Sequence, residues 1–137
     1  MAVPIPDSYR DLLERPIVVT LVTMMPDGHP QASPVWFKYD GTHIFINTAR
    51  GRQKDRNMNA NRRVTVLSVD PDNPYRYLEV RGLVVGITET GALDLINELA
   101  RKYRGADQYY GGVTPVEQRE RETRVTYIIE PTHVVAH

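Results

Sequence analysis

One segment of the chain gathers cationic, amide and hydroxyl side chains that together could bind a phosphate. Between Arg50 and Arg63 the sequence places six cations and a single acid, Asp55, although the whole chain carries 17 basic and 17 acidic residues. The first part of this segment, residues 48–57 (TARGRQKDRN), follows a predicted strand. Arginine suits bidentate contact with phosphate, and Gly51 would let the backbone approach it closely. This distribution favours a local anionic ligand over a polyanion, with a solvated basic turn as the alternative.

Two further segments combine aromatic and polar side chains and could flank a planar ligand. In residues 32–37 (ASPVWF), Ser33 offers a hydroxyl, and Pro34 removes a backbone donor, which is typical of a strand edge. In residues 73–77 two tyrosines bracket Arg76, so an aromatic ligand could stack there while the arginine meets an anion. Core packing in the first segment and a plain turn in the second are the alternatives.

Side chains that usually perform protein-borne catalysis are scarce. The sequence has no cysteine, which excludes disulfides, thiolate metal sites and a cysteine nucleophile. Its four histidines lack metal-ligand spacing, and no Gly-x-Ser-x-Gly elbow, Walker A or Gly-x-Gly-x-x-Gly loop occurs. An enzyme with this sequence would therefore depend on a cofactor for its reactive atoms, and we expect no metal site. The catalytic residue is left open, with Tyr75 as a candidate proton donor.

These segments must be positioned by short strands, which dominate the pattern. Strands are predicted at residues 17–24, 31–39, 43–48, 64–69, 77–88, 124–130 and 132–136. Turns such as Pro26-Asp-Gly28 predict that the first three form an antiparallel meander. Gly82 and Gly86 predict bends or bulges in the long fifth strand.

Helices are predicted to be few. Residues 90–103 have helical spacing of apolar side chains, residues 9–14 predict a short helix, and residues 51–61 predict a short helix or turn. The sequence therefore predicts a mainly β fold, a single domain over residues 1–137 built as an antiparallel six- to seven-stranded barrel with flanking helices. The absence of a strand, glycine loop and helix unit excludes a doubly wound nucleotide fold.

Taken in order, these segments resemble the pyridoxamine 5'-phosphate oxidase-like superfamily of FMN-binding split barrels. Within it, they are most similar to the branch of small reductases that depend on the deazaflavin coenzyme F420. The matching features are Thr23 to Pro30, Ser33-Pro-Val-Trp-Phe37, Thr48, Gly51 to Asn57, Asp70 to Gly82, the helix from Ala92 to Tyr103 and the strand start Arg124 to Tyr127. The likeness covers nearly the whole chain, and its specificity lies in the ordered set.

The resemblance implies a split barrel that forms a homodimer with two cofactor sites at the subunit interface. Carried over to this chain, it implies that Thr48, Arg52, Gln53, Lys54 and Asn57 hold the cofactor phosphate or tail. Ser33, Pro34, Val35 and Trp36 would line the tricyclic ring, and Tyr75, Arg76 and Tyr77 would approach the ring region, from the partner subunit in one arrangement. The run of arginines favours coenzyme F420, which carries a phosphodiester and a polyglutamate tail, with FMN as the alternative.

The leading hypothesis is thus an F420-dependent reductase that transfers hydride between the deazaflavin and a small planar organic acceptor. The alternatives are an FMN-dependent oxidoreductase of the same fold and a non-catalytic flavin or haem carrier. A nucleic-acid-binding barrel is disfavoured because the net charge is zero. We expect a cytoplasmic protein without membrane association, because neither a signal peptide nor an apolar run of roughly 20 residues is recognised. The sequence does not identify the acceptor.

Overall fold

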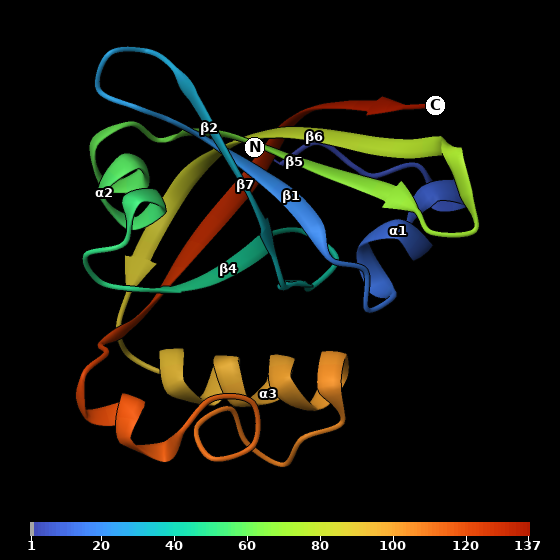
Figure 1. Cartoon of the computed structure of the whole chain (residues 1–137). Helices are drawn as coiled ribbons and strands as arrows, with labels where there is room; N and C mark the ends of the chain where they lie inside the picture. Colours follow the sequence, from blue (N-terminus) through green and yellow to red (C-terminus); the bar gives the residue numbers. More distant parts are fainter. Residues whose placement is uncertain (1) are drawn as a thin grey trace.

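The computed structural model, which describes residues 2–137, shows seven antiparallel strands in one strongly curled sheet (Figure 1). The strands are β1 (Val19–Met24), β2 (Pro30–Val35), β3 (Phe37–Tyr39), β4 (Ile44–Ala49), β5 (Arg63–Asp70), β6 (Asn73–Thr88) and β7 (Arg124–Ala136). The helices are α1 (Asp11–Glu14), α2 (Gln53–Ala60) and α3 (Ala92–Arg104), with 3-10 turns at Asp7–Tyr9 and Val116–Glu120. The predicted mainly β, antiparallel split barrel is confirmed.

The two edges of the sheet meet at one residue, Trp36. In the strand order β2-β1-β5-β6-β7-β4-β3, the edge strands β2 and β3 lie at opposite ends although Trp36 alone separates them in the chain. The sheet must therefore curl until its edges come together. We call this junction the seam.

The seam corrects two predictions. Residues 31–39 are not one strand, because Val35 pairs with Val19 whereas Phe37 pairs with Ile46 on the other edge. The three-stranded meander is wrong for the same reason, since β4 pairs with β3 and β7 and β2 pairs with β1. The alternation of buried side chains continues across Trp36, so the pattern does not reveal the change of partner.

The long β6–β7 ladder contains the expected bulges. Its register shifts between Arg81 and Gly82 and again between Val84 and Gly86. A Cβ at Gly82 would lie 2.5 Å from Ile129 Cγ2 and 2.8 Å from the Glu130 carbonyl oxygen, so only glycine fits there. The prediction of two strands on either side of Pro131 is wrong, because β7 continues through it. Pro131 lies opposite Gly82, where the ladder is already irregular and a missing amide donor is tolerated.

The barrel interior is filled by one hydrophobic cluster, and the first two helices pack at its ends. Strand side chains such as Phe37, Ile46 and Ile129 are fully buried within it. Leu12 and Leu13 of α1 and Met58 of α2 belong to the same cluster, and Figure 1 shows these helices at opposite ends of the barrel. Of the short helix or turn predicted at 51–61, the structure shows the helix, α2, whereas the predicted helix at 9–14 divides into a 3-10 turn and α1.

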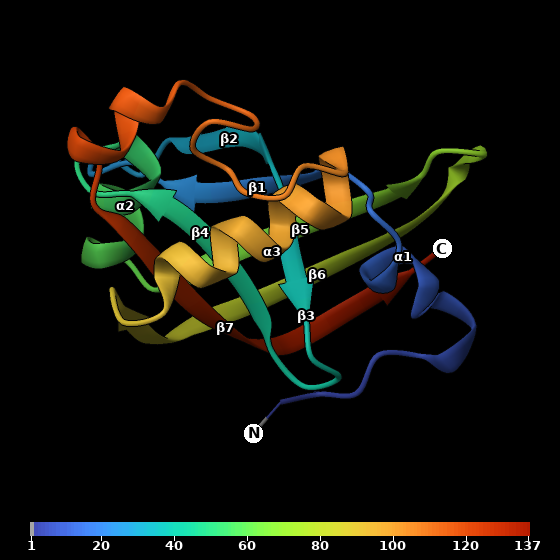
Figure 2. The same cartoon turned by 90° about the horizontal axis from the view of Figure 1, so that it is seen from below.

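Helix α3 lies outside the barrel and forms a second layer with the segment that follows it. It packs on β4 and β7 and buries Ile96 and Leu99, as its spacing predicted. Residues 105–123 then return along the helix, as Figures 1 and 2 show. Among residues 2–137, none of the helices is both long and apolar enough to cross a bilayer.

Candidate functional site

An open pocket of about 330 Å³ lies between the sheet and the layer formed by α3 and residues 105–123. Its lining comes from β2, the seam, β4, α2, α3, the 105–115 loop and β7, with Val18 preceding β1. The lining residues are Val18, Pro34, Val35, Trp36, Asn47, Arg52, Lys54, Ile96, Leu99, Tyr109, Val113 and Arg124. Apolar and aromatic side chains thus share the pocket with three cations.

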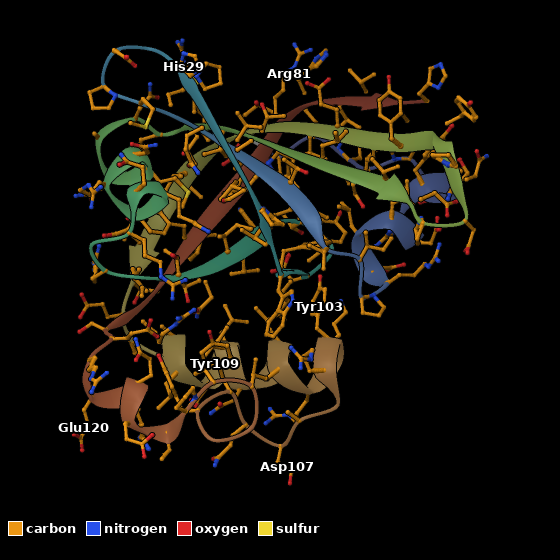
Figure 3. The ribbon with its side chains drawn as sticks, in the orientation of Figure 1. His29, Arg81, Tyr103, Asp107, Tyr109 and Glu120 are labelled. Carbon is orange, nitrogen blue, oxygen red and sulfur yellow. The ribbon has the colours of Figure 1, made fainter. Side chains whose placement is uncertain are left out.

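Trp36 forms the aromatic wall and is held by two tyrosines. The Tyr103 ring stacks on it with centroids 5.2 Å apart and an interplanar angle of 12°, and Tyr109 meets it edge-on at 6.2 Å and 88°. Tyr109 lines the pocket whereas Tyr103 does not, so Tyr103 supports Trp36 from outside. Figure 3 shows both tyrosines between the α3 layer and the strands.

The Tyr103 hydroxyl fixes this support at the seam. It donates to the Ile17 carbonyl oxygen at 2.8 Å and accepts from the Phe37 amide at 3.4 Å. Burial raises the pKa of Tyr103 to about 12, so the hydroxyl keeps its proton and remains a donor at neutral pH. The aromatic wall is therefore anchored to the backbone on both sides of the seam.

Arg124 begins β7 and forms the inner part of the cationic wall. Its guanidinium lies over the Tyr109 ring, 5.1 Å from the centroid, and its Nε donates to Asn47 Oδ1 at 2.9 Å. Asn47 in turn donates to the Ala92 carbonyl oxygen at 2.7 Å. Pairing of Ala49 with Arg124 brings these strands together, so β4, β7 and α3 jointly set the position of this cation.

Glu122 lies between the two arginines of the wall. Its carboxylate accepts from Arg52 Nη2 at 2.8 Å, from Arg124 Nη1 at 3.2 Å and from the Tyr110 hydroxyl at 2.7 Å. Burial alone would raise the pKa of Glu122, but these hydrogen bonds and cations hold it below its usual range. The carboxylate is therefore ionised at neutral pH and offsets part of the positive charge.

Lys54, in the first turn of α2, is the cation left without a counter-charge. No acid within residues 2–137 pairs with it, and its half-buried side chain lines the pocket. Burial lowers the pKa of Lys54, and the nearby Arg52 and Arg124 lower it further. Three cations face one carboxylate here, so the wall is electrostatically suited to an anionic group.

Five of the predicted cofactor-binding residues meet in this pocket. They are Pro34, Val35, Trp36, Arg52 and Lys54. Arg50 and Arg56 of the basic segment are directed elsewhere, since Arg50 pairs with Glu89 and Asp55 and Arg56 donates to the Gly51 carbonyl oxygen and to Gln53. Arg63 lines a groove on the outward face of the sheet. The anion-binding part of the segment is therefore narrower than its composition indicates.

Four other predicted residues lie beside the pocket without lining it. The Ser33 and Thr48 hydroxyl oxygens are buried and lack a hydrogen-bond partner within the described part of the chain. Asn57, 2% exposed, donates to Thr23 Oγ1 at 3.0 Å and accepts from Gln53 Nε2 at 2.8 Å. The contact with Thr23 fixes α2 against β1, whereas the contact with Gln53 lies within α2, and a direct cofactor role for the four stays a prediction.

The predicted residues Tyr75, Arg76 and Tyr77 lie on the β5–β6 hairpin beside α1, at the opposite end of the barrel from α2 (Figure 1). Arg76 pairs with Asp11 at 2.6 Å and with Asp70 at 2.9 Å. The Tyr75 side chain is 82% exposed. One chain does not bring this group to the pocket, so its approach to the ring from a partner subunit stays a prediction.

Sequence reasoning did not assign Asn47, Tyr109, Glu122 or Arg124 to the site. Arg124 was visible as the start of a strand, and Tyr109 as part of a loop rich in tyrosine and glycine. Glu122 was one of several acids in a polar stretch, and nothing in its neighbours distinguished it. The β4–β7 pairing and the fold-back after α3 bring Asn47, Tyr109 and Arg124 to the pocket and Glu122 to the arginines behind its lining.

Comparison with known proteins agrees with this architecture. The family model of pyridoxamine 5'-phosphate oxidase matches residues 5–137. A solved structure named F420 reductase is 41% identical, with a TM-score of 0.79 and coverage of 96% of this chain and 98% of the other. A Listeria innocua protein provisionally named pyridoxamine 5'-phosphate oxidase is 24% identical, with a TM-score of 0.70 and coverage of 95% of each chain.

A third solved structure has the same fold but is named as a different kind of protein. The haem storage protein HutZ from Vibrio cholerae is 11% identical, with a TM-score of 0.68 and coverage of 98% of this chain and 95% of the other. At this identity the likeness concerns the fold alone. None of the curated proteins compared with the chain matches it. The family match over residues 5–137 and the 41% identical structure place this chain in the pyridoxamine 5'-phosphate oxidase family of split-barrel proteins.

Proposed function

We propose that the protein is an oxidoreductase that binds coenzyme F420 in the pocket and transfers hydride between it and a small planar organic acceptor. The observation that carries this proposal is the pairing of an aromatic wall with a cationic wall in one pocket. The 41% identity to an F420 reductase over nearly the full length of both chains supports the choice of cofactor.

The residues present fit such a cofactor. Trp36, Pro34 and Val35 offer a planar and apolar surface for the tricyclic ring. Lys54, which lacks an acid partner, would meet the phosphodiester together with Arg52. The volume of about 330 Å³ is near the lower end for ligand pockets, so the ring would fill it and the tail would leave through its open side.

When bound, the deazaflavin would supply the hydride, and the chain would supply position and charge. The Trp36 and Tyr109 rings pack edge to face, so a planar molecule would lie against this aromatic wall, which would restrict its orientation and bring the reacting atoms into line. Val113 and Leu99 add apolar surface to the lining, which would reduce contact of the bound ring with water. The cations hold the anionic end in place, and none of the described lining residues is a histidine or a carboxylic acid.

The proposed working form is a homodimer with cofactor sites at its interface. The outward face of β1, β5 and β6 forms a groove of about 530 Å³, in which apolar side chains such as Val22, Met24 and Leu83 lie beside Arg63 and Arg81. Apolar patches of this kind mark association surfaces. A second copy seated here would cover this face, and the approach of Tyr75 to Tyr77 to the ring from a partner subunit stays a prediction.

Titration of the intrinsic fluorescence tests cofactor binding directly, because Trp36 is the single tryptophan of the chain and lines the pocket. We expect saturable quenching by oxidised F420 at micromolar protein. Replacing both Arg52 and Lys54 by alanine should weaken this affinity by about 100-fold or more, since two charge-assisted contacts are lost. Lys38→Ala is the matched control, because Lys38 pairs with Glu98 outside the pocket.

The outcomes separate the alternatives. Absence of saturable binding by the wild type, or equal affinity of the double variant, would contradict the proposal. Retention of FMN in the purified protein, with no affinity for F420, would favour an FMN-dependent oxidoreductase. Tight binding without reduction of quinones, enones or tetrapyrroles would indicate a carrier.

A further inference from the structure

We propose that Glu122 is a positioning residue, which holds Arg52 and Arg124 in the arrangement that leaves Lys54 free for the anionic group of the ligand. This inference rests on the proposed function in one respect, namely that the ligand carries an anionic group. It concerns a residue outside the pocket lining, and no pattern in the sequence distinguishes it.

The carboxylate is built into the protein. The Glu122 side chain is 12% exposed, and its Oε1 accepts from both the Tyr110 hydroxyl and Arg124, whose side chain is 6% exposed. Its Oε2 accepts from Arg52, whose side chain is 43% exposed. One oxygen is thus held by buried partners, and the other reaches outward to the cation on the pocket rim.

Arg52 depends on this contact for its position. It is the residue that precedes α2, and Glu122 is the one acid within residues 2–137 that pairs with it. Arg124 and Lys54 repel it from two other elements of the wall, which places three like charges around one space. Without the carboxylate, the Arg52 guanidinium would move into solvent, where its charge is better hydrated.

Two effects of removing the carboxylate oppose each other. Loss of a negative charge makes the wall more positive, which would attract an anion. Loss of the anchor frees a long side chain that must be ordered again when the ligand binds. Salt screens the first effect only in part, because the carboxylate and Arg124 are largely buried, whereas the ordering cost of Arg52 does not depend on salt. We expect the ordering cost to be the larger of the two, so affinity should fall.

Glu122→Gln tests the inference with little change of shape. The amide keeps one acceptor oxygen but directs its NH₂ group toward a cation, so one arginine loses its partner. We expect the affinity for F420, measured by Trp36 quenching at 0.15 M salt, to fall about 5- to 10-fold. Glu120→Gln is the matched control, because it removes the same charge at a position two residues earlier. The Glu120 side chain is exposed and directed away from the pocket, so this change should alter affinity less than twofold (Figure 3).

A double-mutant cycle with Arg52→Gln tests whether Glu122 acts through that arginine. If it does, adding Glu122→Gln to Arg52→Gln should cost less than a further threefold, because the two changes remove one interaction. Independent effects that multiply, or tighter binding by Glu122→Gln, would overturn the inference. Lower thermal stability with unchanged affinity would also overturn it, since the residue would then be structural.

A ligand-free measurement separates this inference from the proposed function. In NMR spectra of the arginine Nε–H groups, Glu122→Gln should shift the Arg52 and Arg124 signals, whereas Glu120→Gln should leave them in place. If these shifts occur but the wild type binds neither F420 nor FMN, the proposed function is rejected and the positioning role is kept. Cofactor binding with unmoved arginine signals in Glu122→Gln would reject the positioning role alone.

Discussion

Tyr127 and Asp55 form a buried pair that fastens α2 to the sheet. The Tyr127 hydroxyl donates to Asp55 Oδ1 at 2.6 Å, and neither side chain is appreciably exposed. The same carboxylate accepts from the Gly51 amide at 2.9 Å and from Arg50 at 3.2 Å. Burial and the hydrogen bond to Asp55 raise the pKa of Tyr127, so the hydroxyl stays protonated and the carboxylate stays its acceptor. One buried acid therefore sets the turn from which Arg52 and Lys54 project.

Tyr127→Phe should lower the free energy of unfolding by about 1–3 kcal/mol, because it leaves a buried carboxylate with one fewer donor. Urea denaturation followed by circular dichroism measures this loss. Tyr39→Phe is the control, since the Tyr39 hydroxyl makes no hydrogen bond among the described residues, and its effect should stay within about 0.5 kcal/mol. Equal losses in both variants would show that the pair does not stabilise the fold.

Among the secondary-structure elements, β6, α1 and β5 are connected by Arg76 at the end of the barrel opposite α2. From β6 it reaches Asp11 of α1 and Asp70 of β5, and it also donates to the Ser8 carbonyl oxygen at 2.7 Å. The Asp72 amide and then the Arg76 side chain lower the pKa of Asp70 below its ordinary 3.8. The ionised form of Asp70 is thus favoured in the folded protein, and α1 is held on the hairpin by charge.

This arrangement gives a defined pH dependence. A carboxylate whose pKa is lowered on folding adds stability above its unfolded pKa of 3.8, and that stability is lost as the pH falls through the lower folded value. Asp70→Asn should therefore be less stable than the wild type at pH 7, and the difference should shrink below pH 4. Urea midpoints across this range test it. Asp107→Asn, an exposed change, should follow the wild type at every pH, and a constant difference for Asp70→Asn would contradict the linkage.

Helices and strands could be predicted where the sequence signal is local. The prediction failed where a strand changes its pairing partner without any local change in the sequence pattern. The glycine bulges of β6 and the apolar spacing of α3 are read from side-chain size and period. The break at Trp36 is not, because burial alternates through it while the chain moves from one sheet edge to the other. The same distinction applies to the residues of the site. Composition alone points to Lys54 and Trp36, whereas Glu122 is recognised only because the fold places it, just before β7, between two arginines.

For the whole molecule, the unpartnered outer face of the sheet is the prominent surface. Leu83 is 42% exposed and Val85 50% exposed on β6, and Leu83 borders the apolar groove shared with β1 and β5. Figure 3 shows Arg81 on this side, away from α3. Burial of such a face by a second copy would remove apolar area from water, and this is the physical basis for the proposed dimer.

Leu83→Glu should convert the proposed dimer to a folded monomer, because it replaces an exposed apolar side chain of the groove by a charged one. Analytical ultracentrifugation measures the mass, and circular dichroism checks the fold. Val116→Glu is the control, since Val116 is 56% exposed in the segment after α3, away from that face, and should leave the mass unchanged. A wild type that sediments as a monomer, or a Leu83→Glu variant that remains a dimer, would reject the arrangement.

The seam has a further consequence for how the barrel opens. β2 and β3 are not paired with each other in the sheet. Separation of these two edges would break the stacking of Tyr103 on Trp36 and the two hydrogen bonds of the Tyr103 hydroxyl, while every strand pair would stay intact. We therefore expect local opening along this line to precede opening of the long β6–β7 ladder. Because Trp36 lies on the same line and lines the pocket, the same opening would widen the pocket and admit planar molecules.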